Sequence, residues 1–96
     1  MIKHIVMFKF KPQADSQECK KVLADLQKLP DKIEVIREYE VGEDVLHSPR
    51  SWDAVLVSTF DNLETLQTYA QHDDHLEVVR RLQNLIEAVV SVDFES

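Results

Sequence analysis

Two segments of this 96-residue chain, residues 2–10 and 52–60, alternate in the manner of β-strands and are apolar on both faces. In the first segment Ile5 and Met7 lie on one face. The opposite face carries Ile2, His4, Val6, Phe8 and Phe10. A strand that is apolar on both sides has to be covered on both sides. The sheet that contains these strands therefore needs one covering layer on each face.

The first half of the chain supplies a helix and an edge strand. Apolar residues recur at helical spacing over residues 16–29, and Asp15 stands in front of them with capping-box spacing to Glu18. Residues 33–41 alternate with one polar face, which is typical of an edge strand. The only glycine and a Ser-Pro pair fall in residues 42–50, which we interpret as a loop.

A second helical region follows the capping residues Asp61 and Asn62, with capping-box spacing from Asp61 to Glu64. Its apolar stripe consists of Leu63, Leu66, Tyr69 and Ala70. We expect this region to break and to restart with Asp73 and Asp74 as caps of a further helix. A last strand is rich in β-branched residues and contains Val89, Val90, Val92 and Phe94.

The resulting order, β-α-β-β-α-β, predicts an α+β, ferredoxin-like fold of one domain over residues 1–96. Both helical regions then cover one face of a four-stranded antiparallel sheet. The other face would expose an apolar patch, which soluble monomers rarely tolerate. We expect a second copy of the chain to cover it in a homodimer that packs sheet on sheet. The residues that form this patch are Ile5, Met7, Val55 and Val57.

Charge and composition narrow the classes of partner. The net charge of −7 has the wrong sign for binding nucleic acid or an anionic membrane surface. No apolar run approaches the roughly 20 residues of a membrane span, and no signal-peptide pattern is present. The single cysteine, Cys19, excludes an internal disulfide, and we interpret it as a small core residue. We therefore expect a cytoplasmic protein.

Two histidines occupy positions that point toward the core. His75 lies on the apolar stripe of the last helix, and His4 lies on the inward face of the first strand. A buried imidazole needs a hydrogen-bonding partner or a chemical role. Tyr69 has the spacing to share a face with His72 and His75. Burial and the first helical turn both favour a neutral His75 ring that can accept a proton.

These residues form a candidate site with His75, Tyr69 and His4 as its reactive groups. The residues expected to contact a ligand are Val6, Phe8, Leu66, His72 and Val79. Two interpretations of His75 stay open: a core histidine bonded to a carbonyl or to Tyr69, and an acid/base with Tyr69 or His4 as the polarising donor.

A metal site is a further alternative, since His72 and His75 with Asp73 or Asp74 could supply nitrogen and oxygen ligands. No third firm ligand is evident, so we predict neither a bound transition metal nor a cofactor. The segment is better explained by acidic residues that cap a restarting helix.

Over its whole length the chain resembles the stress-responsive dimeric α/β-barrel (Dabb) family. The motifs that carry the resemblance are MIKHIVMFKFK at 1–11, VGED at 41–44, WDAVLV at 52–57, YAQHDDH at 69–75 and VDF at 92–94. The resemblance implies a homodimer whose two sheets form a barrel, with a pocket between sheet and helices in each subunit. Polyketide cyclases of this kind are similar at His4, Tyr69 and His75, which implies an acid/base role for the last of these.

Three functions follow as alternatives. The first is a small-molecule-binding barrel protein, linked by resemblance to stress or metabolism. The second is a cofactor-free lyase or cyclase that moves protons on a carbonyl compound, with His75 as the base. The third is a structural or assembly role. A cavity of a few hundred Å³ beside His75 would favour ligand binding, whereas a filled core would favour the structural role.

Overall fold

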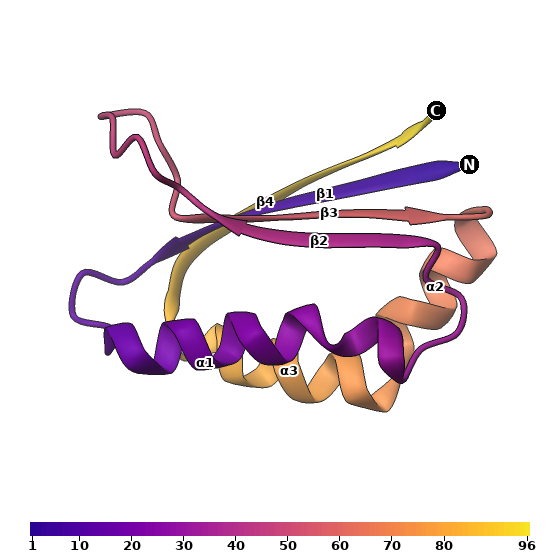
Figure 1. Ribbon diagram of the computed structural model, residues 1–96, viewed down its shortest axis with the longest axis horizontal. Coiled ribbons are helices and arrows are strands. Elements are labelled where there is room, and N and C mark those ends of the chain that lie inside the picture. The colour runs from indigo at the N-terminus through magenta and orange to yellow at the C-terminus, as the bar shows by residue number, and fades with distance from the viewer.

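The computed structural model describes residues 1–96 and confirms the ferredoxin-like α+β fold. Its antiparallel sheet has the strand order β2-β3-β1-β4. The strands are β1 (Ile2–Phe10), β2 (Glu38–Glu43), β3 (Ala54–Phe60) and β4 (Ile86–Glu95). The helices are α1 (Ser16–Gln27), α2 (Leu63–Gln71) and α3 (Asp73–Gln83), with a short 3₁₀ turn, η1 (Leu29–Asp31), after α1. All of them lie on one side of the sheet (Figure 1).

The side of the sheet that faces away from the helices, here called the open face, is aliphatic along its three longest strands. Ile5 of β1 pairs in register with Val57 of β3 and with Val92 of β4, so the three side chains form one row. The apolar residues of the open face are Ile5, Met7, Val55, Val57, Val90, Val92 and Phe94, and Lys3 and Thr59 lie in the same row as Phe94. No element of the chain covers it, and Val92 is 63% exposed.

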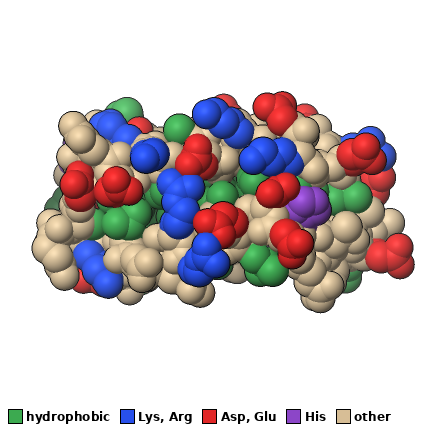
Figure 2. Space-filling model, turned by 90° about the horizontal axis from the view of Figure 1, so that it is seen from below, with side chains coloured by type: hydrophobic (Ala, Val, Ile, Leu, Met, Phe, Trp, Pro, Cys, Tyr) green, Lys and Arg blue, Asp and Glu red, His purple; other side chains and the backbone are tan.

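The opposite side, here called the inner face, packs against the helices and holds the hydrophobic core. Phe60, Leu56 and Leu26 are buried there together with Tyr69 of α2. The outer surface of the helices has a different composition, because basic and acidic side chains alternate over it with smaller apolar areas between them (Figure 2). No helix is long and apolar enough to cross a membrane.

The expected strand over residues 33–41 is wrong at its start, since β2 begins at Glu38. Ile33 is buried to 2% exposure, and its amide donates to the Leu29 carbonyl at 3.0 Å, so it closes η1. The alternation of apolar residues here arises from a buried turn. The edge position of β2 is confirmed, because β2 ends the sheet.

The predicted break between two helices is confirmed, but His72 caps the helix that follows it, α3. Its backbone is extended, with φ −66° and ψ 137°, and its Nδ1 accepts a hydrogen bond from the Asp74 amide at 3.1 Å. Asp73 and Asp74 lie in the first turn of α3. They were expected to cap the helix; instead their charges face its positive end.

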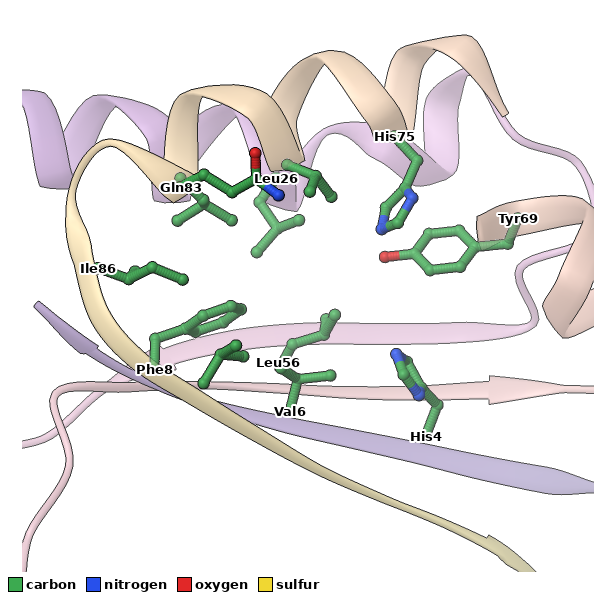
Figure 3. A pocket seen from close by; sticks show the side chains of 12 residues that line it. His4, Val6, Phe8, Leu26, Leu56, Tyr69, His75, Gln83 and Ile86 are labelled. Atoms are coloured by element: carbon green, nitrogen blue, oxygen red, sulfur yellow. The ribbon is translucent and has the colours of Figure 1, made fainter. Parts of the chain in front are cut away.

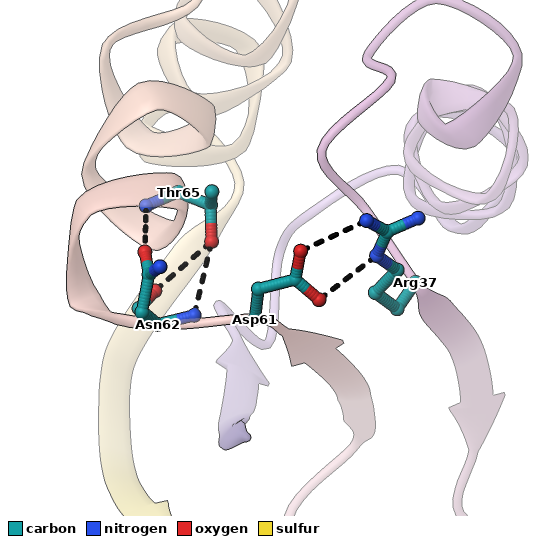
Figure 4. A network of polar contacts seen from close by, with 4 residues as sticks. All are labelled: Arg37, Asp61, Asn62 and Thr65. Atoms are coloured by element: carbon teal, nitrogen blue, oxygen red, sulfur yellow. Dashed lines mark hydrogen bonds and ion pairs between the residues drawn. The ribbon is translucent and has the colours of Figure 1, made fainter.

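The cap of α2 is shifted by one residue from the expected position (Figure 4). Asn62 accepts from the Thr65 amide at 2.9 Å, and the Thr65 hydroxyl accepts from the Asn62 amide at 3.2 Å. Asp61 instead forms two hydrogen bonds with Arg37, at 2.9 and 2.8 Å. This shift leaves Leu63 65% exposed, outside the apolar stripe assigned to it. At α1, Asp15 is the cap as expected, although it accepts from the Gln17 amide and not from Glu18.

Candidate functional site

A cavity of about 180 Å³ lies between the inner face of the sheet and the helices (Figure 3). Twelve residues line it, and nine of them are hydrophobic. The apolar wall includes Val6, Phe8, Leu26, Leu56, Val79, Leu82, Ile86 and Val89. His4, Tyr69 and His75 converge at one end, and Gln83 lies toward the other end, near Ile86 (Figure 3). The space is therefore an apolar chamber with one concentrated polar end.

Most of the residues predicted for the site come together around this cavity. Those that line it are His4, Val6, Phe8, Tyr69, His75 and Val79. Two of the predicted ligand contacts, Leu66 and His72, do not line it. Leu66 packs against the hydrophobic core cluster, and the His72 side chain caps α3. The helix is interrupted at His72, and the His72 ring turns toward the Asp74 amide. The ring therefore does not share a helix face with Tyr69 and His75.

His75 has a defined tautomer. Its Nδ1 lies 3.0 Å from the Ala70 carbonyl oxygen, and since a carbonyl only accepts, Nδ1 carries the proton. The outer ring nitrogen, Nε2, is then an acceptor that points into the cavity (Figure 3). Burial lowers the pKa of His75, the hydrogen bond to Ala70 opposes that change, and positive charge on His4 or His72 would add to it. A neutral ring with a free lone pair results.

The His4 ring contacts the carboxylate of Asp93. The two residues are paired in register across β1 and β4, and the His4 Nδ1 forms a short contact with Asp93 Oδ1. The other ring nitrogen points toward the cavity (Figure 3). Sequence reasoning missed Asp93 because Val92 and Phe94 marked the last strand as apolar. Aligning that strand with the first one would have paired Asp93 with His4.

Tyr69 stands between the two histidines. It is 1% exposed, and its ring centroid lies 4.3 Å from that of His75 and 6.2 Å from that of His4. Its hydroxyl lies 2.8 Å from the Tyr39 hydroxyl. Burial raises the pKa of Tyr69 to about 12, although the hydrogen bond with Tyr39 acts in the lowering direction. Tyr69 is therefore a neutral hydroxyl at physiological pH, and Tyr39 is a second residue that sequence reasoning missed.

The arrangement combines a neutral proton acceptor, His75, and a neutral donor, Tyr69, at the end of an apolar space. No lysine or arginine lines the cavity. No group of three or more His, Cys, Asp or Glu side chains is arranged to hold a metal ion. Cys19 is buried on α1 away from this wall, and burial raises the pKa of its thiol. The polar end thus suits a neutral oxygen-bearing group.

Comparison with known families agrees with the motifs and with this fold. The family model described as the Stress responsive A/B Barrel Domain, Dabb, matches residues 2–96. The chain belongs to the Dabb family.

Individual relatives extend the comparison. A stress-response A/B barrel domain-containing protein of Arabidopsis thaliana is 31% identical over 98 residues, a match that covers 98% of this chain and 36% of the plant protein. This chain therefore spans just over a third of that relative's length.

Two solved structures have the same architecture. A dimeric protein of unknown function and ferredoxin-like fold from Bacteroides fragilis is 35% identical, with a TM-score of 0.84 and coverage of 99% of this chain and 95% of that one. Hydroxynitrile lyase from Passiflora edulis superimposes with the same TM-score of 0.84 at 20% identity, covering 97% and 90% of the two chains. At that identity the likeness concerns the fold alone.

Proposed function

We propose that this Dabb protein is a homodimer that binds a small, largely apolar molecule in the cavity of each subunit. The single observation that carries the proposal is the composition of that cavity. Nine of its twelve lining residues are hydrophobic, and one of these, Tyr69, meets His4 and His75 at one end. Ligand sites in proteins commonly combine an apolar lining with a few convergent polar groups.

The homodimer half of the proposal is supported by the open face. Its aliphatic residues are continuous across β3, β1 and β4, with Ile5, Val57 and Val92 in one row. A patch of this kind is unusual on a monomer, and a self-complementary surface is what a two-fold dimer requires. The Bacteroides fragilis relative, at 35% identity, is described as dimeric.

The residues that line the cavity restrict the chemical class of the ligand. Without a cationic side chain on that wall, a carboxylate or phosphate would lose its hydration without gaining a counter-charge. A neutral ketone, aldehyde or phenol can instead use the Tyr69 hydroxyl and the His75 Nε2 atom. The family description links the chain to stress response, and we propose that its ligand is a small molecule of that physiology.

Binding is tested with a panel of small neutral ketones and phenols, followed by backbone amide shifts in NMR spectra. We expect the largest shifts near Val6, His75 and Val79, and we expect Val79→Phe to abolish them by filling the cavity. Leu76→Phe is the matched control, because Leu76 is on the same helix and 49% exposed. If no compound binds and Val79→Phe makes the fold more stable, the cavity is a packing defect and the role is structural.

A second candidate function is catalysis on such a ligand. His75 Nε2 would take a proton from the carbon next to a carbonyl group, and the C–H electron pair would form an enolate whose oxygen accepts a hydrogen bond from Tyr69. The lone pair of the neutral His75 ring, next to the Tyr69 hydroxyl, favours this chemistry. It requires no cofactor.

This candidate is tested by following the exchange of α-hydrogens of acetophenone for deuterium in D₂O by NMR. We expect the native protein to accelerate exchange and His75→Ala to abolish the acceleration. Binding without accelerated exchange would leave the protein as a binding protein and exclude this reaction for that ketone.

A further inference from the structure

Tyr39 contacts a residue of the cavity wall but is not one of the residues that line the cavity. It comes from β2, and its hydroxyl lies 2.8 Å from the Tyr69 hydroxyl. Its backbone is fixed to α1 by Gln27, which donates to the Tyr39 carbonyl at 3.4 Å and accepts from the Val41 amide at 2.9 Å. The contact between the two tyrosines is thus anchored to the edge strand and to a helix.

The two possible directions of this hydrogen bond leave different protons free. The Tyr39 hydroxyl has one protein partner, Tyr69, and Tyr39 is half-buried, whereas Tyr69 is 1% exposed. If Tyr69 donated, its only proton would be used on Tyr39, and no hydroxyl donor would be left for a ligand at the polar end of the cavity. If Tyr39 donates, the Tyr69 oxygen accepts that bond, and the proton of Tyr69 is left for an acceptor in the cavity that Tyr69 lines. The pKa of Tyr39 is raised far above its usual range by burial, so it is always available as a donor.

We propose that Tyr39 is a positioning residue that donates its hydroxyl proton to Tyr69 and so directs the Tyr69 O–H toward an acceptor oxygen of the ligand. The ligand half of this inference rests on the proposed binding function. A hydroxyl that accepts one hydrogen bond becomes a better donor of another, so Tyr39 also strengthens the bond that Tyr69 makes. The cavity therefore selects neutral ligands with a carbonyl-type acceptor over hydrocarbons of the same shape.

A matched pair of probes tests the proposed effect of Tyr39 on ligand binding. Acetophenone carries a carbonyl oxygen, and α-methylstyrene has a CH₂ group in its place. We expect Tyr39→Phe to weaken acetophenone binding by about three- to tenfold and to leave α-methylstyrene binding unchanged. The infrared carbonyl stretch of bound acetophenone, lowered in the native protein, should move back toward its unbound frequency. Phe8→Leu, which alters the apolar wall, should weaken both probes equally.

Two results would overturn this half of the proposal. One is an equal loss of both probes in Tyr39→Phe, which indicates a purely structural tyrosine. The other is unchanged binding of acetophenone with an unchanged carbonyl frequency. Tyr69→Phe is the reference variant, since it removes the donor itself and should abolish the frequency shift completely.

The direction of the hydrogen bond is tested without any ligand, so it can be judged even if neither probe binds and the proposed function fails. The chain has only two tyrosines, so labelling tyrosine with carbon-13 at Cζ gives two signals, assigned by the two Phe variants. In mixed H₂O and D₂O, a slowly exchanging hydroxyl splits its Cζ signal. We expect the splitting of Tyr39 to disappear in Tyr69→Phe. Splitting of Tyr69 that depends on Tyr39 would reverse the donor and overturn the proposal.

Discussion

The inner and open faces of the sheet are built by alternate residues of the same strands, yet neighbouring rows differ completely in polarity. On the inner face His4 is flanked in register by Ser58 and Asp93. One residue further along, on the open face, Ile5 is flanked by Val57 and Val92. In these two rows the polar groups lie on the face where the helices supply further hydrogen-bonding partners.

This difference separates two roles within one sheet. The helices over the inner face bring Tyr69 and His75 to the polar row, so a chemical site can form inside a single chain. The open face has no partner in the chain, and its aliphatic row can be buried only by another surface. Strands that are apolar on both sides therefore indicate assembly on one face, whereas a histidine on such a strand indicates the face that holds the site.

The largest expected effect comes from a charge on the open face. Val57→Asp would bury a carboxylate against the partner sheet, beside Glu40 in register, and weaken association by about 3–5 kcal/mol. Analytical ultracentrifugation should show monomers or unfolded chains. Leu76→Asp, on the outer surface of α3, should leave the dimer intact. A native protein that sediments as a monomer at micromolar concentration would contradict the assignment of the open face.

A smaller effect is expected on the inner face. His75→Ala should abolish binding of the neutral probes while lowering the free energy of unfolding by less than about 1 kcal/mol. The reason is that Ala70 is only half-buried, so its carbonyl can bond to water after the ring is removed. Thermal and chemical unfolding measure this directly. A loss of about 1–3 kcal/mol would instead identify His75 as a structural residue.

The pH dependence of stability gives a further test of the same ring. Because the folded pKa of His75 lies below the ordinary value of 6.5, the unfolded chain binds a proton that the folded chain excludes. Stability therefore falls as the pH drops through about 6.5, and it continues to fall until the folded pKa is passed. His75→Gln should lose less stability than the native protein between about pH 7 and about pH 5. His4, Asp93 and His72 are the same in both proteins, so equal pH slopes would contradict a buried neutral ring.

The last prediction concerns the cap of α2. Asn62→Ala removes the acceptor of the Thr65 amide and should cost about 1 kcal/mol of unfolding free energy. Glu64→Ala should change it by less than about 0.5 kcal/mol, since Glu64 takes no part in the cap. Urea unfolding of the two variants compares them. A larger loss of unfolding free energy in Glu64→Ala than in Asn62→Ala would instead support the capping box from Asp61 to Glu64 that the spacing alone indicates.

Much of the fold was predictable because its signals are local. The alternation in β1, the helical period of α1 and the break before Asp73 each follow from short stretches of sequence. The errors arise where local signals are ambiguous. Ile33 fits a strand pattern but closes a buried turn, and two adjacent residues, Asp61 and Asn62, are equally good caps. The Asp61 carboxylate bonds to Arg37, which leaves Asn62 as the cap.

The candidate site was predictable in part. His4, Tyr69 and His75 are polar residues in apolar patterns, and all three line the cavity. Their supporting residues lack such a signal. Asp93 reaches His4 through the pairing of strands at opposite ends of the chain, and Tyr39 reaches Tyr69 from an edge strand. Contacts of this kind depend on strand register and on helix placement, which short-range patterns do not encode.

The strand order has one more consequence, for protein quality control. The two edges of the sheet are β2 and β4, and they are unequally protected against pairing with foreign strands. β2 carries Glu38, Glu40 and Glu43, so its charges repel an incoming strand. β4 is ten residues long and exposes several large apolar side chains. The sheet therefore has one vulnerable edge, and misassembly would begin at β4.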